Sequence, residues 1–560
     1  MAASALRRGL VVAGVLALPY VPFLLGLDLR AASPSAATAA AALLGAAALG
    51  APGAAGMLLG RGRGAARRVV QALAGAVLAN VAAMIALRLA GVEPGPTSFA
   101  AALGAMTVAA GVAGHARGGR VPDPRRAPAA AVIFGAAFLL AAEAGLDVVP
   151  PLEDQDSEVQ GTAPGLVQDL APVCLTNRST LHYFAHPPLL HALAASTLTL
   201  AGQLPAVRAA HDAAREELST IPAAERRGWP AVAKALRGGI PRRDYSLRWW
   251  RDVYGAFVAD PALLGTRAPN FVLAAVAATL LFLWLLRLGA TSFDAGLLVA
   301  VYATLPEVFV RSGYGGYYAI DAATWLAAAW LATGSAGGGR AGYFAGGLGA
   351  LADQKLLLFG AVAAAVANAR ALVARHRSAL LRALPLVLGM AAASLAFWVY
   401  GLAVAPADFV TDHWREHGLA RFVGTPAKAG PGQLAYPSRA ALWLELGEHY
   451  GIWAALAAGA VLAGIARARG GRDETGAATL LVAWTAAVAI VFTLADWRQT
   501  KHLALFVPAA TLLIGMMLAE ARPGPRVALR LALVAALAWN VAELLRLARD
   551  FESMSATPLW

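Results

Sequence analysis

The sequence predicts an all-α protein that crosses a membrane many times, and two observations support this prediction. The 560 residues are 59% hydrophobic and 14% charged, with a mean hydropathy of +0.60, whereas soluble domains average about 45–50% apolar and about 25% charged residues. Apolar runs of roughly 18–24 residues recur along nearly the whole chain, and a helix of this length crosses about 30 Å of hydrocarbon. The composition therefore excludes a water-soluble globule.

Charge and cysteine content exclude several other classes. Lysines and arginines number 46 against 33 acidic residues, which gives a formal charge of +13. In a soluble protein this excess would indicate a nucleic-acid partner, but here the expected partner is the lipid bilayer and no nucleic acid is expected. The single cysteine, Cys174, excludes an intramolecular disulfide framework and a cysteine-based zinc or iron–sulfur site.

Apolar runs between charged or Pro/Gly-rich breaks predict about fifteen spanning helices. Five precede a long polar interruption, near 9–27, 37–60, 69–92, 98–116 and 129–148. The others follow it, near 268–288, 294–311, 317–334, two short runs within 341–374, 384–404, 450–467, 477–494, 502–520 and 526–546. We therefore divide the chain into an N-terminal four-helix membrane extension (1–128), a membrane core (129–520), and a C-terminal helix and tail (521–560).

Arginines in the short loops predict the orientation, because basic loops stay on the cytoplasmic side. With the N-terminus inside, the basic groups around Arg67, Arg117, Arg370, Arg467 and Arg526 all fall on that side. The opposite side receives two outer loops, 149–266 and 405–449, and the C-terminal tail. The Ala- and Arg-rich composition is typical of a GC-rich bacterial genome, so we expect a bacterial inner (plasma) membrane with the outer loops facing the periplasm.

The longer outer loop begins with a cluster of carboxylates, Glu153, Asp154, Asp156 and Glu158. Clustered carboxylates can take a proton from an attacking hydroxyl or hold a divalent cation. The alternative is a solvated acidic turn at the membrane boundary. Further along this loop, Ala206–Leu218 and Trp229–Leu236 have helical patterns that are too polar to span, so we expect amphipathic helices on the outer leaflet.

A histidine followed by two prolines lies in the same loop. His186 directly precedes Pro187 and Pro188, and an apolar helical stretch follows them. The fixed φ of proline holds the backbone here, which makes His186 a candidate substrate-binding residue. The alternative is a helix start with an incidental imidazole.

Ionisable residues at the membrane boundary are further candidates. Glu307, Arg311 and Asp321 would be costly there unless they face a cavity or each other, and a structural ion pair between Arg311 and Asp321 is the alternative. Arg267 lies at the outer end of a spanning run and could simply extend its charge to the interface.

The second outer loop contains two histidines, His413 and His417, which would lie one turn apart in a helix. That spacing could bind a metal, and the alternative is a lid that faces the acceptor. The sequence leaves open whether the protein needs a divalent cation.

Several short motifs occur in the order seen in GT-C membrane glycosyltransferases. They are the acidic run 153–158, the His-Pro-Pro-Leu segment at 186–189, Arg-Ala-Pro-Asn at 267–270, Arg-Ser-Gly-Tyr at 311–314 leading to Asp321, the Gly-rich run 346–355 ending in lysine, and Trp-Arg-Gln-Thr-Lys-His at 497–502. The chain resembles the protein-mannosyltransferase and lipid A aminoarabinose-transferase group over about 129–520.

The resemblance implies a GT-C-like helix bundle and an inverting hexosyl or pentosyl transferase. Such an enzyme moves a sugar from a polyprenyl-phosphate donor to a lipid, glycan or protein acceptor at the outer membrane face, with a loop carboxylate as general base. Asp154 or Asp156 is the implied base and Glu158 is a further candidate. The family's adjacent Asp-Glu pair is spread out here, so the choice stays open.

The resemblance also implies roles for cations and polar groups. The implied ligands of the donor phosphate are Arg267, Lys355, Arg498 and Lys501, since fixed cations stabilise an anionic leaving group. The implied substrate-binding residues are His186, Arg311, Tyr314, Tyr318, Asp321, His413 and His417.

Two other functions compete with a transferase. A secondary transporter or lipid flippase would also line its path with charges in the membrane, but it commonly shows repeated halves with broken helices near the midplane. A catalytically silent scaffold for cell-envelope assembly would tolerate loss of the acidic run. Charges at the outer rim and a long outer loop favour an enzyme that acts on one face.

Overall fold

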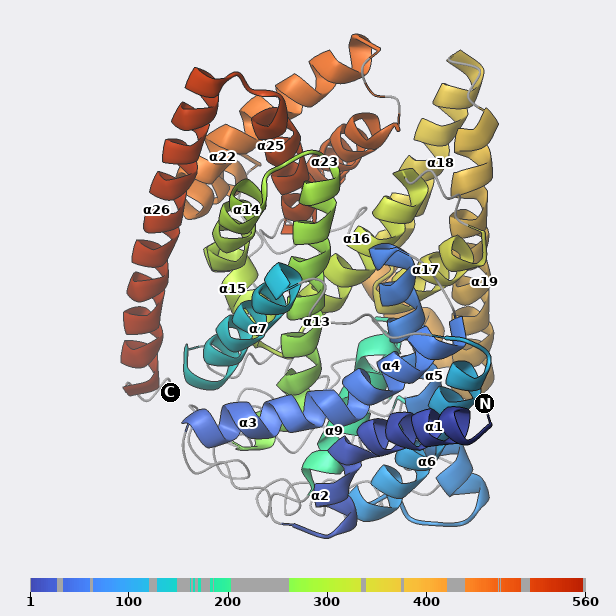
Figure 1. The fold of residues 1–560 in the computed structure, drawn as a ribbon. Helices are drawn as coiled ribbons and strands as arrows, with labels where there is room; N and C mark the ends of the chain where they lie inside the picture. The colour runs from blue at the N-terminus through green and yellow to red at the C-terminus, as the bar shows by residue number, and fades with distance from the viewer. Residues whose placement is uncertain are drawn as a thin grey trace.

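The computed structural model describes residues 2–27, 34–60, 64–119, 128–148, 162, 165–166, 170–172, 182–184, 186–202, 261–333, 339–373, 377–419, 439–471, 473, 475–494 and 504–556. These residues are 89% helical and contain no strand. The predicted all-α class is confirmed for this part of the chain (Figure 1).

The described helices fall into an N-terminal and a C-terminal series. The first comprises α1 (Ala2–Ala17), α2 (Val21–Leu24), α3 (Pro34–Gly45), α4 (Ala51–Gly60), α5 (Ala65–Leu89), α6 (Pro96–Ala116), α7 (Pro128–Glu143), the π-helical η4 (Ala144–Val148) and α9 (Leu189–Ala201). The second comprises α13 (Pro261–Arg287), α14 (Ser292–Thr304), α15 (Pro306–Gly313), α16 (Tyr318–Thr333), α17 (Gly339–Ala352), α18 (Leu356–Val373), α19 (Arg377–Val404), α20 (Pro406–Phe409), the π-helical η6 (Val410–Leu419), α22 (Arg439–Arg469), α23 (Ala477–Leu494), α25 (Val507–Glu520) and α26 (Pro523–Ala556).

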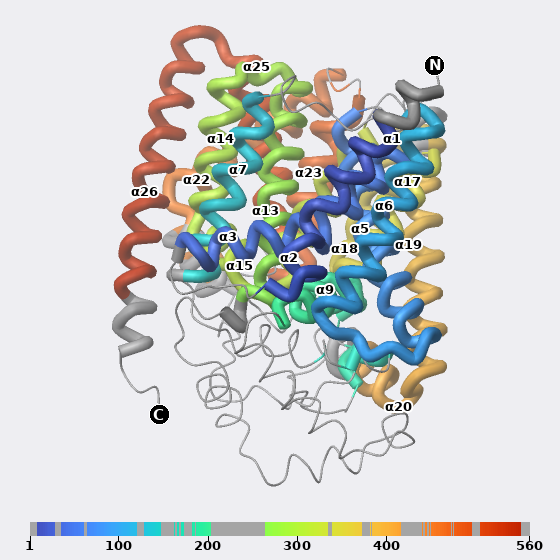
Figure 2. The backbone as a smooth tube through the Cα atoms, turned by 60° about the horizontal axis from the view of Figure 1, so that its bottom comes forward, coloured from blue at the N-terminus to red at the C-terminus, as the bar shows by residue number. Residues whose placement is uncertain are grey.

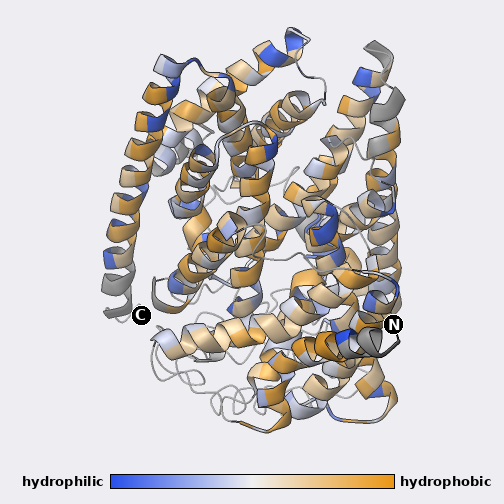
Figure 3. Cartoon of the chain, viewed as in Figure 1, coloured by the Kyte–Doolittle hydropathy of each residue, from blue (hydrophilic) through white to orange (hydrophobic). Residues whose placement is uncertain are grey.

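Each predicted apolar run coincides with described helical structure, but fewer runs meet the criteria for a membrane span. Nine described helices are long and apolar enough to cross a bilayer, and a tenth span results if α14 and α15, which are bent by 70°, count as one. The protein is thus a polytopic helical membrane protein, and the count of fifteen crossings stays a prediction. Figure 3 shows apolar residues along the lengths of the helices, many of which end in hydrophilic residues.

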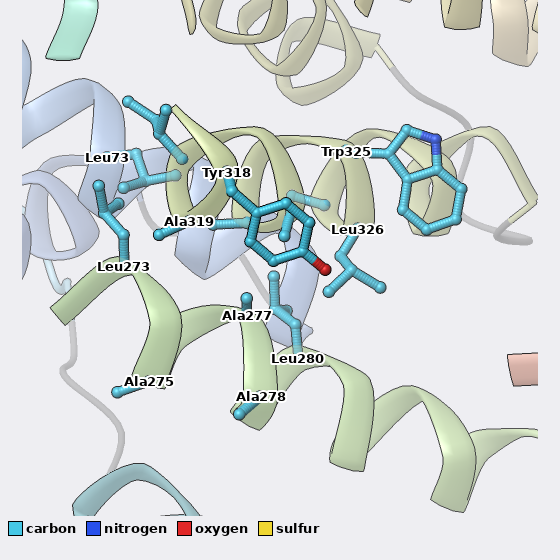
Figure 4. Packing of buried hydrophobic residues seen from close by; sticks show 14 of the residues in the cluster. Leu73, Leu273, Ala275, Ala277, Ala278, Leu280, Tyr318, Ala319, Trp325 and Leu326 are labelled. Atoms are coloured by element: carbon cyan, nitrogen blue, oxygen red, sulfur yellow. The ribbon is translucent and has the colours of Figure 1, made fainter. Parts of the chain in front are cut away.

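Helix α13 lies at the centre of the bundle, in contact with α3, α7, α9, α14 and α16. Alanines on α13 let α16 approach closely, and Figure 4 shows Tyr318 and Leu326 of α16 packed toward Ala277 and Leu280 of α13. One continuous apolar core extends from Leu16 in α1 to Ala536 in α26. The N-terminal helices therefore share the core of the rest of the chain, and the division at residue 128 stays a prediction.

The proline inside α13 is matched by a side chain from α9. Pro269 has no N–H to donate to the carbonyl oxygen of Gly265, four residues earlier. The hydroxyl of Thr197 donates a hydrogen bond to that oxygen instead, at 2.5 Å. The apolar stretch after His186, which the sequence predicts to be helical, is α9, and this contact fixes it against α13.

The glycine-rich run of α17 serves helix packing. A Cβ on Gly346 would lie 2.0 Å from the carbonyl oxygen of Leu386 in α19, and one on Gly389 would lie 1.9 Å from that of Tyr343. Glycine at both positions therefore permits the close contact between α17 and α19, a common arrangement in membrane helices. This contact holds the turn between α17 and α18, where Asp353 and Lys355 lie.

One end of the bundle, the arginine-rich end, is defined by Arg370, Arg467, Arg526 and Arg530. Arg530 pairs with Asp294 at the start of α14 at 2.7 Å, and Arg467 pairs with Glu520 at the end of α25. Arg370 of α18 donates to the carbonyl oxygen of Asp473, which precedes α23. These four arginines thus lie around the ends of neighbouring helices, and the cytoplasmic assignment of this end stays a prediction.

The other end carries α9, α15, α20 and the turn between α17 and α18. Figure 2 shows α26 running from the arginine-rich end, near α25, toward the end where α9 and α20 lie. Lys355 and Arg370 lie at the two ends of α18, and α17 packs beside it. The predicted orientation needs two crossings within 341–374, and these two crossings stay a prediction.

Candidate functional site

Five polar residues meet at the end opposite the arginines, and we call them the polar cluster: His186, Tyr317, Asp321, Asp353 and Lys355. The Nζ atom of Lys355 pairs with a carboxylate oxygen of Asp353, and Nδ1 of His186 lies 3.7 Å from the same oxygen. Asp321 has Asp353 and Lys355 as its charged neighbours. Three segments far apart in the sequence are thereby joined through their side chains.

The turn between α17 and α18 positions two members of the cluster. Oδ1 of Asp353 accepts a hydrogen bond from the backbone N–H of Lys355 at 2.9 Å, immediately before α18 begins. Asp353 is fully buried, and Asp321 in the first turn of α16 is 2% exposed. Two adjacent carboxyl groups beside one ammonium carry an excess negative charge unless a proton is held among them. The arrangement can therefore hold and release a proton.

His186 is oriented by an aromatic ring that is itself anchored. The imidazole stacks on Tyr317, with 4.0 Å between ring centroids. The hydroxyl of Tyr317 lies 3.1 Å from Nε2 of His191 in α9. His191 also bonds to the backbone of Pro187, and burial lowers its pKa from 6.5 to about 4. In neutral His191 the Nδ1–H donates to the carbonyl oxygen of Pro187, so Nε2 accepts a hydrogen bond from the hydroxyl of Tyr317.

Two side chains of the Arg-Ala-Pro-Asn motif donate hydrogen bonds to backbone carbonyl oxygens near this cluster. Nδ2 of Asn270 donates to the carbonyl oxygens of Tyr314 and Gly316 at 2.5 and 2.8 Å, just before Tyr317. Nη1 of Arg267 donates to the carbonyl oxygen of Gly145 in η4 at 2.5 Å. Arg267 is fully buried, so it does not extend its charge to an exposed interface.

Close packing of η4 on the end of α15 makes this arrangement possible. A Cβ on Gly145 would lie 2.1 Å from the carbonyl oxygen of Gly313. Glycine at this contact brings the carbonyl that Arg267 binds next to the connection that Asn270 holds. The motif thus links α7, α13 and the start of α16.

A second group, the tyrosine cluster, lies beside α16 and consists of Tyr302, Glu307, Arg311, Tyr318 and Tyr450. Nη2 of Arg311 lies 2.7 Å from Glu307, one turn earlier on α15, and Nη1 donates to the hydroxyl of Tyr314 at 2.7 Å. The hydroxyls of Tyr302 and Tyr318 lie 3.5 Å apart. The alternative ion pair between Arg311 and Asp321 is wrong, because Arg311 pairs with Glu307 and Asp321 faces Asp353.

The segment before His186 forms hydrogen bonds with the start of the second predicted outer loop. The backbone N–H and Nδ1 of His182 lie 3.1 and 2.8 Å from Oδ2 of Asp408 in α20. The N–H of Phe184 donates to Asp412 at 2.6 Å, and Nδ1 of His413 lies 3.1 Å from the carbonyl oxygen of Phe184. The predicted outer loops therefore meet next to the polar cluster.

The predicted site residues divide into four groups. Arg267 and His413 lie next to backbone carbonyl oxygens, those of Gly145 and Phe184, and belong to neither cluster. The polar cluster unites His186, Asp321 and Lys355, while Arg311, Tyr314 and Tyr318 lie around the tyrosine cluster. The residues outside the described part of the chain are Asp154, Asp156, Glu158, Arg498 and Lys501, and the side chain of His417 is also outside it. A pocket shared by Arg267, Lys355, Arg498 and Lys501, the four cations that are predicted to bind a donor phosphate, stays a prediction.

Sequence reasoning missed several residues that the structure brings to these clusters: Asp353, His191, His182, Asp408, Tyr302 and Tyr450. Asp353 lies two residues before the predicted Lys355. This short spacing between a carboxylate and a candidate cation was a signal by which the sequence could have indicated Asp353. Tyr302 and Tyr450 carry no comparable signal, because a tyrosine in an apolar run is most often a core residue.

The described residues give no support to a metal centre. Within the described ranges, no group of three or more histidine, cysteine, aspartate or glutamate side chains could hold a metal ion. His413 instead directs Nδ1 at the carbonyl oxygen of Phe184. The acidic run at 153–158 lies outside these ranges, so a divalent cation there stays a prediction.

Comparisons of the chain with protein-family models, with curated proteins and with solved structures found no match.

Proposed function

We propose that the protein is a GT-C-type inverting glycosyltransferase of a bacterial inner membrane. It would move a sugar from a polyprenyl-phosphate donor to a cell-envelope acceptor at the extracytoplasmic face. The observation that carries this proposal is the polar cluster, which joins segments of three motifs through the contacts of His186, Tyr317 and Asp353.

The chemistry of the cluster fits transfer from a lipid phosphate. Lys355 offers a cation to the leaving phosphate, while Asp353 keeps that cation in place. His186 and the two buried carboxyl groups can exchange a proton with a hydroxyl acceptor. The predicted base, Asp154 or Asp156, belongs to the same predicted outer loop as His186.

The test measures release of polyprenyl phosphate, which every such transfer produces whatever the sugar. The protein in nanodiscs is given a panel of polyprenyl-phosphate hexoses and pentoses, with membrane extract as the source of acceptor. Wild type should consume at least one donor, and either Asp154→Asn or Asp156→Asn should slow it by about 10²-fold or more. Glu93→Gln, an exposed carboxylate before α6, is the control and should keep wild-type turnover.

Near-normal turnover in both carboxamide variants would move the base elsewhere. No consumption of any donor by wild type would refute the transferase.

A second candidate function, a lipid flippase or secondary transporter, is favoured by one observation. The bent pair α14 and α15 breaks by 70° beside the buried tyrosine cluster, and broken helices next to buried polar groups are typical of transporter substrate sites. Movement of a labelled lipid-linked sugar between leaflets, without release of polyprenyl phosphate, would support this candidate over the transferase.

A further inference from the structure

The polar cluster holds two carboxyl groups that lie away from water. Asp353 is fully buried and Asp321 is 2% exposed, and the carboxyl group of Asp321 is in hydrogen-bond contact with that of Asp353. Two ionised carboxylates only repel each other, since neither carries a donor. A hydrogen bond between these two groups therefore requires a proton on one of them.

The contacts of Asp353 show that it is the ionised partner. One of its oxygens accepts a hydrogen bond from the backbone N–H of Lys355 at 2.9 Å, and the other pairs with the ammonium group of the same residue. Both contacts favour a negative charge on the carboxylate. Asp353 thus balances the positive charge of Lys355.

Asp321 has no comparable set of donors. Its Oδ1 atom is buried and has no hydrogen-bond partner among the residues that the structure describes. The charged groups that act on its carboxyl group are Asp353 and Lys355. Because burial disfavours an ionised carboxylate without a cation of its own, Asp321 is the member of the pair that holds the proton.

His186 is the other group of the cluster that could carry this proton. Its Nδ1 atom lies 3.7 Å from the carboxylate of Asp353, whereas a charge-assisted hydrogen bond from an imidazolium would be about 2.7–2.9 Å long. The imidazole stacks on the ring of Tyr317, whose hydroxyl is directed to His191. The geometry thus favours the carboxyl pair over the imidazole as the place of the proton.

We propose that Asp321 and Asp353 form a proton-binding site that is occupied at neutral pH. Asp321 is a neutral carboxylic acid, and its O–H donates a hydrogen bond to the carboxylate of Asp353. With this proton, Asp321, Asp353 and Lys355 together carry no net charge. Without it, they carry one net negative charge.

The proton should control how Lys355 meets an anion. Loss of the proton places a second carboxylate beside Lys355, and this carboxylate opposes the approach of a phosphate. By linkage, an anion bound at Lys355 should in turn strengthen binding of the proton. This coupling rests on the proposed function, which supplies a phosphate to Lys355, whereas the proton site itself does not.

Infrared spectroscopy tests the proton site without any substrate. The full protein in dodecyl maltoside, a detergent without carbonyl groups, should show the C=O stretching band of a protonated carboxyl group at pH 7. Labelling with [4-¹³C]aspartate should shift this band, and a rise in pH should remove it. Asp321→Asn should lack the band at pH 7.

Asp294→Asn is the matched control. Asp294 is also buried, but Nε of Arg530 lies 2.7 Å from its carboxylate, so it is ionised and its replacement should leave the band in place. Asp353→Asn provides a second variant if Asp321→Asn does not fold. It removes the neighbouring negative charge, so the band should disappear at a lower pH than in wild type.

A second measurement tests the coupling, with farnesyl phosphate as the probe. Its Kd for wild type should rise by about 5–150-fold, the usual range for two coupled sites, once the pH exceeds that at which the band disappears. Asp321→Asn should lose this pH dependence, because an amide cannot release the proton.

An unchanged band in Asp321→Asn, or no aspartate band in wild type at pH 7, would overturn the proton site. The band with a pH-independent Kd for farnesyl phosphate would keep the proton site and remove the coupling. Donor turnover without the band removes the proton site alone, whereas the band without turnover of any donor retains it and removes the proposed transferase.

Discussion

The two ends of the bundle use charged residues in different ways. At the arginine-rich end, the cations meet helix termini: Arg526 donates to the carbonyl oxygens of Leu518 and Ala519 at the end of α25, and Arg530 pairs with Asp294 in the first turn of α14. At the opposite end, Asp353 is fully buried and shares its surroundings with Asp321, Lys355 and His186.

The difference teaches how to separate structural from functional charges in this protein. A cation at a helix C-terminus satisfies free carbonyl groups and favours the local dipole, so it contributes to folding without any ligand. Two buried carboxyl groups side by side oppose folding unless a cation or a proton accompanies them. We therefore expect substitutions at the arginine-rich end to change stability and those at the polar cluster to change activity.

The largest expected difference between the two ends is their accessibility from outside the cell, which should be all-or-none. After Cys174→Ser, single cysteines within 149–266 or 405–449 should react with an impermeant thiol reagent added to intact cells. Cysteines within 117–127 or 467–475 should react only after lysis, because basic loops stay in the cytoplasm. Labelling of the latter pair in intact cells would reverse the assignment of the two ends.

The next effect compares two buried aspartates, one at each end. Asp353→Asn should lower donor turnover by about 10²-fold or more, because it removes the charge that holds Lys355 and His186, and each charge-assisted hydrogen bond contributes about 1.5–3 kcal/mol. Asp294→Asn should lower the Tm but change turnover less than about twofold. Equal losses of turnover in the two variants would contradict the assignment of activity to the polar cluster and of stability to the arginine-rich end.

The third comparison is the change in donor Kd, which should be about ten- to a hundredfold for variants near the polar cluster and absent for a variant at the arginine-rich end. Lys355→Ala and Arg267→Ala should weaken binding of a polyprenyl-phosphate sugar, since each removes a predicted cation near the leaving phosphate. Arg530→Ala, which removes a cation of the arginine-rich end, is the control and should leave the donor Kd unchanged. Retention of wild-type affinity by both of the first two variants would place the phosphate elsewhere.

The smallest effect concerns pH and His191. Because burial lowers the pKa of His191 from 6.5 to about 4, the unfolded chain binds a proton that the folded chain does not as the pH falls from about 6.5 to 4. The contribution of His191 to the free energy of unfolding is thus fully present above about pH 6.5. Up to roughly 1–3 kcal/mol of this contribution is lost as the pH falls to about 4.

His191→Gln should flatten this part of the pH dependence, measured as Tm between pH 7 and 4. His115→Gln, near the end of α6, is the control and should keep the wild-type slope. An unchanged slope in His191→Gln would mean that another group causes the loss.

The sequence alone determined the fold class and the positions of the long apolar helices, whereas the break between α14 and α15 within the predicted run 294–311 was not predicted. Apolar length is a local property, since each run must satisfy its own backbone hydrogen bonds within the membrane, and so α13, α19 and α26 could be located without any tertiary contact. The proline pair after His186 predicted where α9 begins for the same reason. Local pattern could not decide the number of true crossings, because α16 and α17 are short helices buried by their neighbours.

Only the tertiary structure decided which polar residues meet. The sequence indicated His186, Asp321 and Lys355 as separate candidates, but it could not show that Asp353 pairs with Lys355 while Tyr317 stacks on His186, nor that Arg311 turns to Glu307 rather than to Asp321. Tyr302 and Tyr450 gave no signal at all. Contacts of this kind depend on how α9, α15, α16 and α18 pack in space, and glycines and alanines at the helix interfaces set that packing at a distance from the residues it brings together.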